Sequence, residues 1–306
     1  MSRLHHSYAG HLRWMQMSCI QLFVFVEGKH CDPYFFGNVC SVILETQVEY
    51  YISTARQIPG YTGGKQALIA FFDYLRKKRS LVTDLGGERT ASIFFLDKDL
   101  DDLKRCKKRS PHIVYTEYYD VQNYIFQNGD LVKGAASAAS VDYRRLEGDL
   151  VDSCRWCIRV ATLWRDWVSL CLRLSEDQIP CSANYRVLSC IQTRYCGPTD
   201  PVALENLTLD IARQANISVD DLRRKFATTT SKVNRYYRRG EHHRIFKGKW
   251  FAAILADDVD RIMAGDHYDK NGLSSRITSA VAATLDFTEP WVEYFRNSIS
   301  DVIAML

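Results

Sequence analysis

Acidic residues follow two apolar runs of the sequence, at the points where buried strands would end. Glu27 comes directly after the run 20–26, and Asp97 and Asp99 come directly after the run 91–96. Short apolar runs rich in β-branched and aromatic residues are typical of buried strands. Because the carboxyl ends of parallel strands meet at one edge of a sheet, we expect the three acids to share that edge. In an extended segment residues i and i+2 point to one side, so Asp97 and Asp99 would aim at a common point while Lys98 faces away.

Carboxylates gathered in this way are hard oxygen ligands, which suit Mg²⁺ or Mn²⁺. Such ions hold phosphate groups and activate a water nucleophile, so the pattern predicts a metal-dependent phosphodiesterase. The structural alternative is that the Asp-x-Asp pair is an ordinary solvated turn and Glu27 a surface acid. Each motif alone favours that alternative. Both motifs in this order, with a glycine-rich turn at 60–64 and a helix between them, favour the site.

The elements that must position these acids alternate along the first half of the chain. Asp32 followed by Pro33 is a typical helix start. This alternation predicts an α/β fold, with a parallel sheet flanked by helices and right-handed crossovers. We expect strands at 20–26, 48–52, 91–96 and 112–115 and helices at 32–44 and 65–79.

The second half of the chain has a different pattern. A stretch rich in small residues at 129–142 is typical of a linker, and from about residue 143 the apolar spacing is helical. We therefore expect a catalytic domain at 1–135, followed by a mainly helical domain at 136–306 that binds substrate and partner.

Bulk composition narrows the class of protein. The 306 residues are 46% hydrophobic, enough for a buried core, and the formal net charge of +4 is small for this length. Affinity for nucleic acid would thus come from local basic patches, which weakens a pure binding-protein interpretation. The ten cysteines are scattered and expected to be reduced, and neither a membrane span nor a leader segment is apparent. We expect a cytoplasmic protein without membrane contact.

One basic segment, 235–250, is interleaved with aromatic residues, a mixture that binds phosphates and stacks on unpaired bases. Basic residues at 223–225 could extend it. The alternative is a solvated helical face whose aromatic residues are buried. The candidate nucleic-acid-binding residues are Arg235, Arg238, Arg239, His243, Arg244, Lys247 and Lys249.

Two motifs carry a resemblance to a known family. The segments "FVFVEGKHCDPYFF" and "SIFFLDKDLDD" resemble the Toprim domain of topoisomerases, primases and overcoming-lysogenisation-defect nucleases. The sequence is most similar to the Toprim-like domain-of-unknown-function 4435 group, which includes effector subunits of PARIS anti-phage defence systems. Gly63-Gly64-Lys65 and the segment "YDVQNY" at 119–124 also match that group. The resemblance covers roughly 20–130, and the helical remainder more faintly.

The resemblance implies a Toprim-like sheet and a bacterial endoribonuclease effector that cleaves transfer RNA, works with an ATPase partner subunit and is a homodimer when active. It implies that Glu27 is a metal ligand or general acid-base and that Asp97 and Asp99 bind metal. Lys29 and Lys65 would neutralise charge on the phosphate or the leaving oxygen. The plainer alternative for Lys65 is a solvated helix start.

The chain departs from the group at one position. Gln122 stands where the group often has Glu, which puts a second metal site in doubt; Glu117, Asp120 or Asp101 could substitute. Two other functions compete: a DNA nuclease with the same site, and a degenerate Toprim module that serves as a binding subunit of an ATPase complex. The glycine-rich turn lacks P-loop spacing, so ATP hydrolysis by this chain is not expected.

Overall fold

The chain divides into two units that each have their own packing. The computed structural model describes residues 7–58, 63–150 and 152–306, apart from the side chain of residue 149. Unit 1 comprises the chain up to Glu117 together with Asp286–Leu306, and unit 2 comprises Tyr118–Leu285. The chain thus leaves the first unit before the expected boundary at residue 136, and it returns to that unit at its end.

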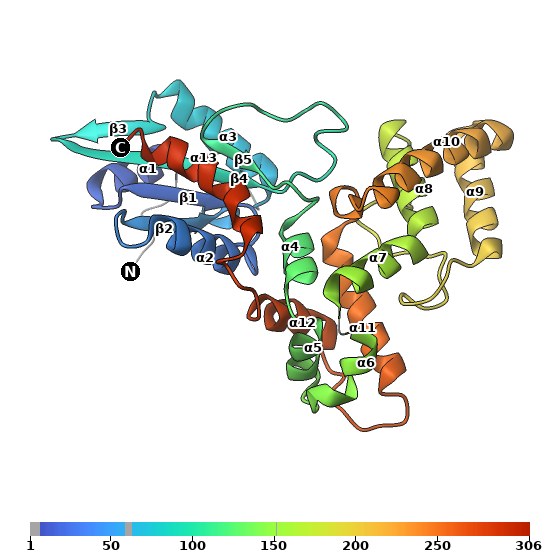
Figure 1. Cartoon of the computed structure of the whole chain (residues 1–306). Coiled ribbons are helices and arrows are strands. Elements are labelled where there is room, and N and C mark those ends of the chain that lie inside the picture. Colours follow the sequence, from blue (N-terminus) through green and yellow to red (C-terminus); the bar gives the residue numbers. More distant parts are fainter. Residues whose placement is uncertain (1–6, 59–62, 151) are drawn as a thin grey trace. The chain divides into compact units, whose positions relative to one another are not determined.

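Unit 1 is an α/β unit built on a five-stranded sheet, as predicted (Figure 1). The strand order is β2-β1-β4-β3, and β5 also pairs with β4. All pairings are parallel except that of β3 with β4. The strands are β1 (Leu22–Val26), β2 (Tyr50–Thr54), β3 (Val82–Leu85), β4 (Glu88–Leu96) and β5 (Ile113–Tyr115).

The antiparallel strand β3 was not among the strands expected from the sequence. Gly86 and Gly87 both have positive φ, at 68° and 92°. Two successive residues with positive φ make a tight hairpin turn whose twist matches that of the flanking strands. In this hairpin β4 begins earlier than expected, at Glu88. The residues of β3 are half-buried or exposed and do not form the apolar run that would have predicted a buried strand.

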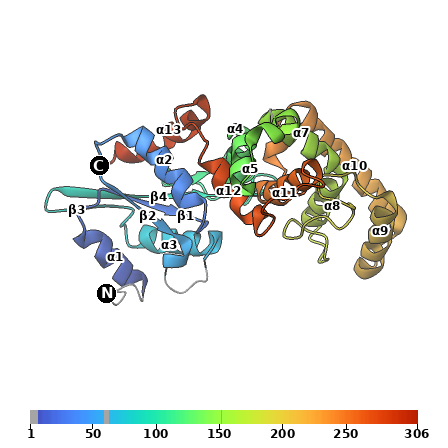
Figure 2. The ribbon, with the colours of Figure 1, turned by 90° about the horizontal axis from the view of Figure 1, so that it is seen from below.

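Helices cover both faces of this sheet (Figure 2). Phe25 and Phe94 stack at 4.7 Å on the face covered by α1 and α3, where Phe71 packs against them. Phe36 and Phe95 stack at 4.3 Å on the opposite face, which α2 and α13 cover. Burial on both faces explains why the strands are apolar throughout rather than alternating. The helices are α1 (Tyr8–Met17), α2 (Asp32–Leu44), α3 (Lys65–Lys77) and α13 (Glu293–Ile303), with the 3₁₀ turns η1 (Ala55–Gln57) and η5 (Pro290–Val292).

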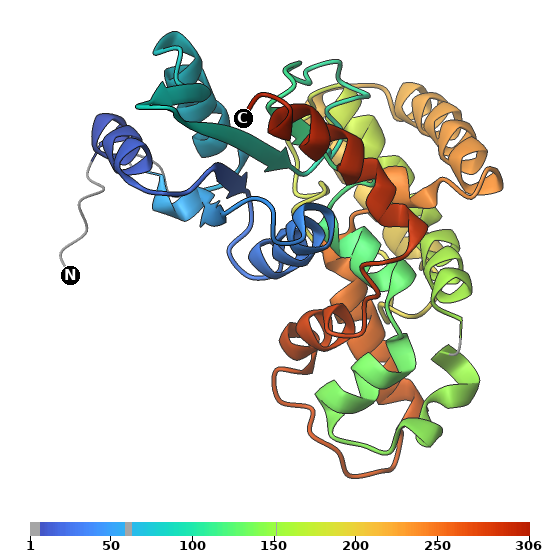
Figure 3. The same ribbon diagram turned by 60° about the vertical axis from the view of Figure 1, so that its left-hand side comes forward.

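The C-terminal helix α13 belongs to the sheet unit although the sequence pattern assigned it to the helical domain. Figure 3 shows it, in red, running alongside β4. Its Phe295 is fully buried and contacts the rings of Phe36 and Phe95. The apolar stripe of α13 is therefore part of the core of unit 1.

Unit 2 is built from helices and the loops that connect them. The expected linker at 129–142 contains α5, and a Cβ added at Gly134 would lie 2.5 Å from Val281 of α12. The small residues thus permit close helix packing rather than marking a linker. Trp164 and Trp167 are fully buried and belong to the core of this unit. The helices are α4 (Val121–Asn128), α5 (Leu131–Ala139), α6 (Glu147–Leu150), α7 (Ser153–Leu163), α8 (Arg165–Glu176), α9 (Pro201–Ala215), α10 (Val219–Arg238), α11 (Phe251–Ile262) and α12 (Leu273–Ala282), with the 3₁₀ turns η2 (Tyr143–Arg145), η3 (His242–Arg244) and η4 (Gly248–Trp250).

None of the helices in the described parts of the chain has both the length and the apolar character needed to cross a membrane.

Candidate functional site

The register of the sheet brings the ends of three strands to one edge. Val26 at the end of β1 pairs with Phe95, and Leu96 at the end of β4 pairs with Tyr115. The residues that follow these strands, Glu27, Asp97 and Glu117 among them, therefore leave the sheet at the same edge. Backbone pairing alone therefore confirms the expectation that the residues after β1 and β4 share one sheet edge.

A glycine fixes the turn that carries Glu27. The Gly28 amide donates a hydrogen bond to Asp32 Oδ2 at 2.6 Å, and Asp32 is buried at the start of α2. A Cβ on Gly28 would lie 2.6 Å from Asp32 Oδ1, so no other residue fits without displacing the carboxylate. The turn therefore holds Glu27 half-buried at the sheet edge, while Lys29, directly after it, is exposed.

The chain turns sharply after β4 instead of continuing in an extended form. Asp97 is 3% exposed, but Asp99 has a φ of 50°, in the left-handed region. Asp97 and Asp99 are therefore not related by strand alternation, and that step of the sequence argument was wrong. Short polar side chains such as Asp adopt this backbone conformation more readily than most others.

Lys65 at the start of α3 links two of the acids. Its Nζ lies 2.5 Å from Asp99 Oδ2 and 2.9 Å from Asp101 Oδ2, and its side chain is 14% exposed. Burial alone would lower the pKa of the Lys65 ammonium, but the attraction of Asp99, hydrogen bonds to Asp99 and Asp101, and the charge of Glu27 together raise it. Lys65 is thus a half-buried cation paired with acids of this edge and not a solvated helix start.

Two glycines form the turn that leads into α3 and Lys65. Gly63 and Gly64 have φ of 116° and 81°, a conformation that other residues rarely adopt. The remainder of the predicted glycine-rich turn, 60–62, lies outside the described residues.

Lys98 is a residue whose importance the sequence argument missed. It was expected to face away from the site, yet its side chain is 2% exposed. Its amide donates to Thr116 Oγ1 at 2.9 Å and its Nζ donates to the carbonyl oxygen of Glu117 at 2.7 Å. Its Nζ also lies 3.8 Å from Asp102 Oδ2. Lys98 therefore links the end of β4 to the end of β5 and stabilises the sheet edge that Asp97 follows.

The donor set fits a hard cation only in part. Within the described ranges, no three His, Cys, Asp or Glu side chains come together as a group that could hold a metal ion. Mg²⁺, however, is usually bound through one or two carboxylates together with waters and substrate phosphates. Glu27 and Asp97 are the two carboxylates that directly follow β1 and β4 and could act as such ligands. Asp99 and Asp101 both bind the Lys65 ammonium.

The predicted nucleic-acid-binding residues all lie in unit 2, and the structure separates them into two groups. Arg235, Arg238, Arg239 and Lys249 are exposed. His243, Arg244 and Lys247 are half-buried in local contacts: the His243 ring lies 4.0 Å from that of Tyr118, Arg244 lies 3.8 Å from Glu241, and the Lys247 Nζ donates to the carbonyl oxygen of Tyr185.

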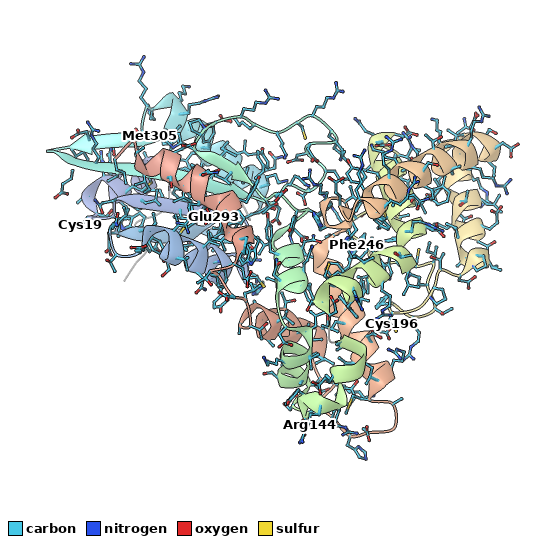
Figure 4. The ribbon with its side chains drawn as sticks, viewed as in Figure 1. Cys19, Arg144, Cys196, Phe246, Glu293 and Met305 are labelled. Atoms are coloured by element: carbon cyan, nitrogen blue, oxygen red, sulfur yellow. The ribbon has the colours of Figure 1, made fainter. Side chains whose placement is uncertain are left out.

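Two aromatic residues of the same segment, Phe246 and Trp250, are core residues, as the structural alternative predicted, whereas Tyr236 and Tyr237 are half-buried. Phe246, labelled in Figure 4, is fully buried, and Trp250 is 3% exposed and stacks on Tyr185. These rings are not available to stack on bases.

The segment at 119–124 has a structural role in unit 2. Asp120 caps α4: its Oδ1 accepts from the backbone amide and side-chain amide of Asn123 at 3.2 and 3.0 Å. Its Oδ2 accepts from the Lys249 amide at 3.3 Å, and a Cβ on Gly248 would lie 2.2 Å from Asp120 Oδ1. Asp120 therefore fastens η4 to α4, which leaves it poorly suited to replace a metal ligand. Gln122 is largely buried in the same helix.

Comparisons with known protein families and curated proteins found no relative of this chain. No model of a known protein family matches the chain, and no curated protein is similar to it in sequence. What the fold defines is an α/β unit with an acidic sheet edge, joined to a helical unit.

Proposed function

We propose that the chain is a metal-dependent endonuclease that uses Glu27, Asp97 and Asp99, with RNA as its substrate. The observation that carries the proposal is the parallel register of β1 on β4, which ends both strands in acids at one edge. The raised pKa of Lys65, caused in part by Asp99 and Glu27, is consistent with acids gathered around one point.

The roles of the side chains follow from their charges. A bound Mg²⁺ or Mn²⁺ would supply Lewis-acid activation of water and of the phosphate. Glu27 and Asp97 would hold the ion, and Asp99 would join them when substrate competes for Lys65. The Lys65 ammonium would then stabilise negative charge on the phosphate oxygens, while exposed Lys29 attracts the substrate backbone.

The finer parts of the proposal rest on the Toprim resemblance. They are transfer RNA as the substrate, an ATPase partner subunit, a homodimeric active form in the bacterial cytoplasm and a role in anti-phage defence. DNA is the second candidate substrate for the same site.

The test compares the wild type with Glu27→Ala and with Glu49→Ala, which removes an exposed acid from the same unit. The proteins are induced in cells with and without an ATPase partner gene, and RNA ends are sequenced. Purified proteins are assayed on RNA and DNA with Mg²⁺ or EDTA. We expect discrete RNA ends from the wild type and Glu49→Ala, and a cleavage rate at least about 100-fold lower with Glu27→Ala. Circular dichroism checks that Glu27→Ala is folded; cleavage retained by that folded variant would refute the mechanism.

A binding subunit of an ATPase complex is the alternative function, and the Lys65 contacts favour it. An ammonium that already neutralises Asp99 and Asp101 gives these acids a role without metal. Titration with Mn²⁺ followed by electron paramagnetic resonance separates the two functions. A nuclease binds Mn²⁺ in a Glu27-dependent manner, whereas no such binding would favour the alternative.

A further inference from the structure

Unit 1 contains a second feature beside the acidic edge, an open cavity of about 810 Å³. The loop between β4 and β5, β5 itself and α13 line it. Figure 4 shows nitrogen-tipped side chains extending from this loop. Its main lining residues are Arg105, Lys107, Lys108, Arg109, Tyr115 and Tyr294.

The cavity carries an excess of positive charge. The acids that line it already face cations: Asp101 binds Lys65, and Asp102 lies 3.8 Å from the Lys98 ammonium. Among the cations, Lys108 pairs with Asp73. In the described parts of the chain, no carboxylate lies within ion-pairing distance of the remaining ones, Arg105, Lys107 and Arg109. The lining therefore attracts anions, although the net charge of the chain is small.

Aromatic rings adjoin these cations. Tyr294 is 39% exposed, and its hydroxyl donates to the carbonyl oxygen of Tyr115 at 2.7 Å, which fixes the ring at the cavity wall. The Lys107 ammonium lies 5.2 Å from the centre of the Tyr115 ring. Cations that track a phosphate backbone beside an aromatic ring that can stack on bases form the usual binding surface for single-stranded nucleic acid.

We propose that this cavity binds a single-stranded segment of RNA and leads it to the acidic edge, an inference that rests on the proposed function. Arg105, Lys107 and Arg109 contact phosphates, and Tyr294 stacks on a base. Asp101 joins the two places, because it lines the cavity and binds the same Lys65 ammonium as Asp99. The volume suits a few nucleotides rather than a lone phosphate.

The charge part of the proposal is tested by binding without cleavage. The full-length chain in EDTA is titrated against a short fluorescein-labelled single-stranded RNA at several salt concentrations. The variant Arg105→Gln/Arg109→Gln is compared with Lys77→Gln/Lys78→Gln, which removes equal charge from the same unit outside the cavity. The cavity variant should lower the slope of log Kd against log salt by about 0.7 for each lost phosphate contact, or about 1.4 for two.

The control pair should keep the wild-type slope. Equal slopes for both variants would overturn the proposal, because charge alone would then explain binding.

The stacking part is tested at Tyr294. Tyr294→Phe keeps the ring and removes the hydroxyl, whereas Tyr294→Ala removes both. We expect Tyr294→Ala to weaken RNA binding at least about fivefold and Tyr294→Phe to weaken it less than twofold. Equal affinity of both variants and the wild type would remove Tyr294 from the binding surface.

Failure of this inference can be told apart from failure of the proposed function. If Arg105→Gln/Arg109→Gln cleaves RNA normally and keeps the wild-type salt slope, the cavity is not the RNA site, but the proposed nuclease function is unaffected. A wild type that cuts nothing but binds RNA through Arg105 and Arg109 would leave the cavity standing and remove the nuclease function.

Discussion

At the scale of single residues, the acidic edge is organised by lysines as much as by acids. Lys65 engages Asp99 and Asp101, and Lys98 ties together the ends of β4 and β5. Lys98 is buried for structural reasons, since it bridges a neighbouring carbonyl and an acid. Lys65 pairs with Asp99 and Asp101, so under the proposed function it would compete with the metal ion for these acids.

We predict that Lys65→Met raises the affinity for Mn²⁺ by about five- to tenfold while lowering cleavage. Removing the competing ammonium frees Asp99 and Asp101 for the ion but takes a positive charge from the phosphate, and a tenfold change corresponds to about 1.4 kcal/mol. Lys65→Arg keeps the charge and should retain wild-type Mn²⁺ affinity. Calorimetric titration measures both, and weaker Mn²⁺ binding by Lys65→Met would show that Lys65 supports the ion instead of competing with it.

A pH dependence is expected from His242 in unit 2. Burial lowers the pKa of its imidazole from the ordinary 6.5 to about 4. Between those pH values the unfolded chain binds the proton and the folded chain does not, so the free energy of unfolding falls as pH falls through this window, by up to about 3 kcal/mol. Above pH 6.5 this residue contributes no slope.

Urea denaturation at several pH values checks this expectation. His242→Leu should flatten the dependence between pH 6.5 and 4, whereas His267→Asn, which changes an exposed histidine, should not. A slope that survives His242→Leu would assign the acid sensitivity to other groups.

At the scale of elements, η4 and α4 of the helical unit make a close contact. Asp120, Asn123 and Gly248 are in close contact, with no room for a Cβ on the glycine. The segment 119–124, which the family resemblance singled out, therefore packs against η4.

Gly248→Ala should destabilise the helical unit by about 1–3 kcal/mol, the usual range for overpacking. Gly148→Ala is the matched control, because nothing lies within 4 Å of an added Cβ there. Tryptophan fluorescence during urea unfolding reports mainly on this unit, which holds Trp156, Trp164, Trp167 and Trp250. Equal stability of both variants would contradict the close packing at Gly248.

At the scale of the whole molecule, the two units differ in how the chain builds them. The helical unit is one continuous stretch, Tyr118–Leu285, whereas the sheet unit needs the chain before it and the segment after it. Within the sheet unit, α13 covers α2 and β4 with the buried rings of Phe295 and its neighbours.

We predict that a fragment of residues 118–285 folds alone, whereas the chain truncated after residue 285 loses the sheet unit. Without α13 the apolar face around Phe36 and Phe95 is exposed; by comparison, loss of one buried Phe side chain costs about 3–5 kcal/mol. Circular dichroism and limited proteolysis of both fragments check this, with Phe295→Ala in the full-length chain as a milder variant. A truncated chain with an intact, protected sheet would show that α13 is dispensable.

The sequence by itself determined the α/β class, the strands that become β1, β2, β4 and β5, the start of α2 at Asp32, and the common edge for Glu27 and Asp97. These features depend on local apolar patterns and on the rule that parallel strands end together, both of which are readable along the chain. The tertiary structure decided what depends on contacts between distant residues: the burial of Lys98, the pairing of Lys65 with Asp99 and Asp101, the return of α13 to the sheet, and the packing of the small residues of α5 against α12. A lysine or a run of small residues looks the same in a sequence whether it faces solvent or a partner; only the fold supplies the partner that fixes its place.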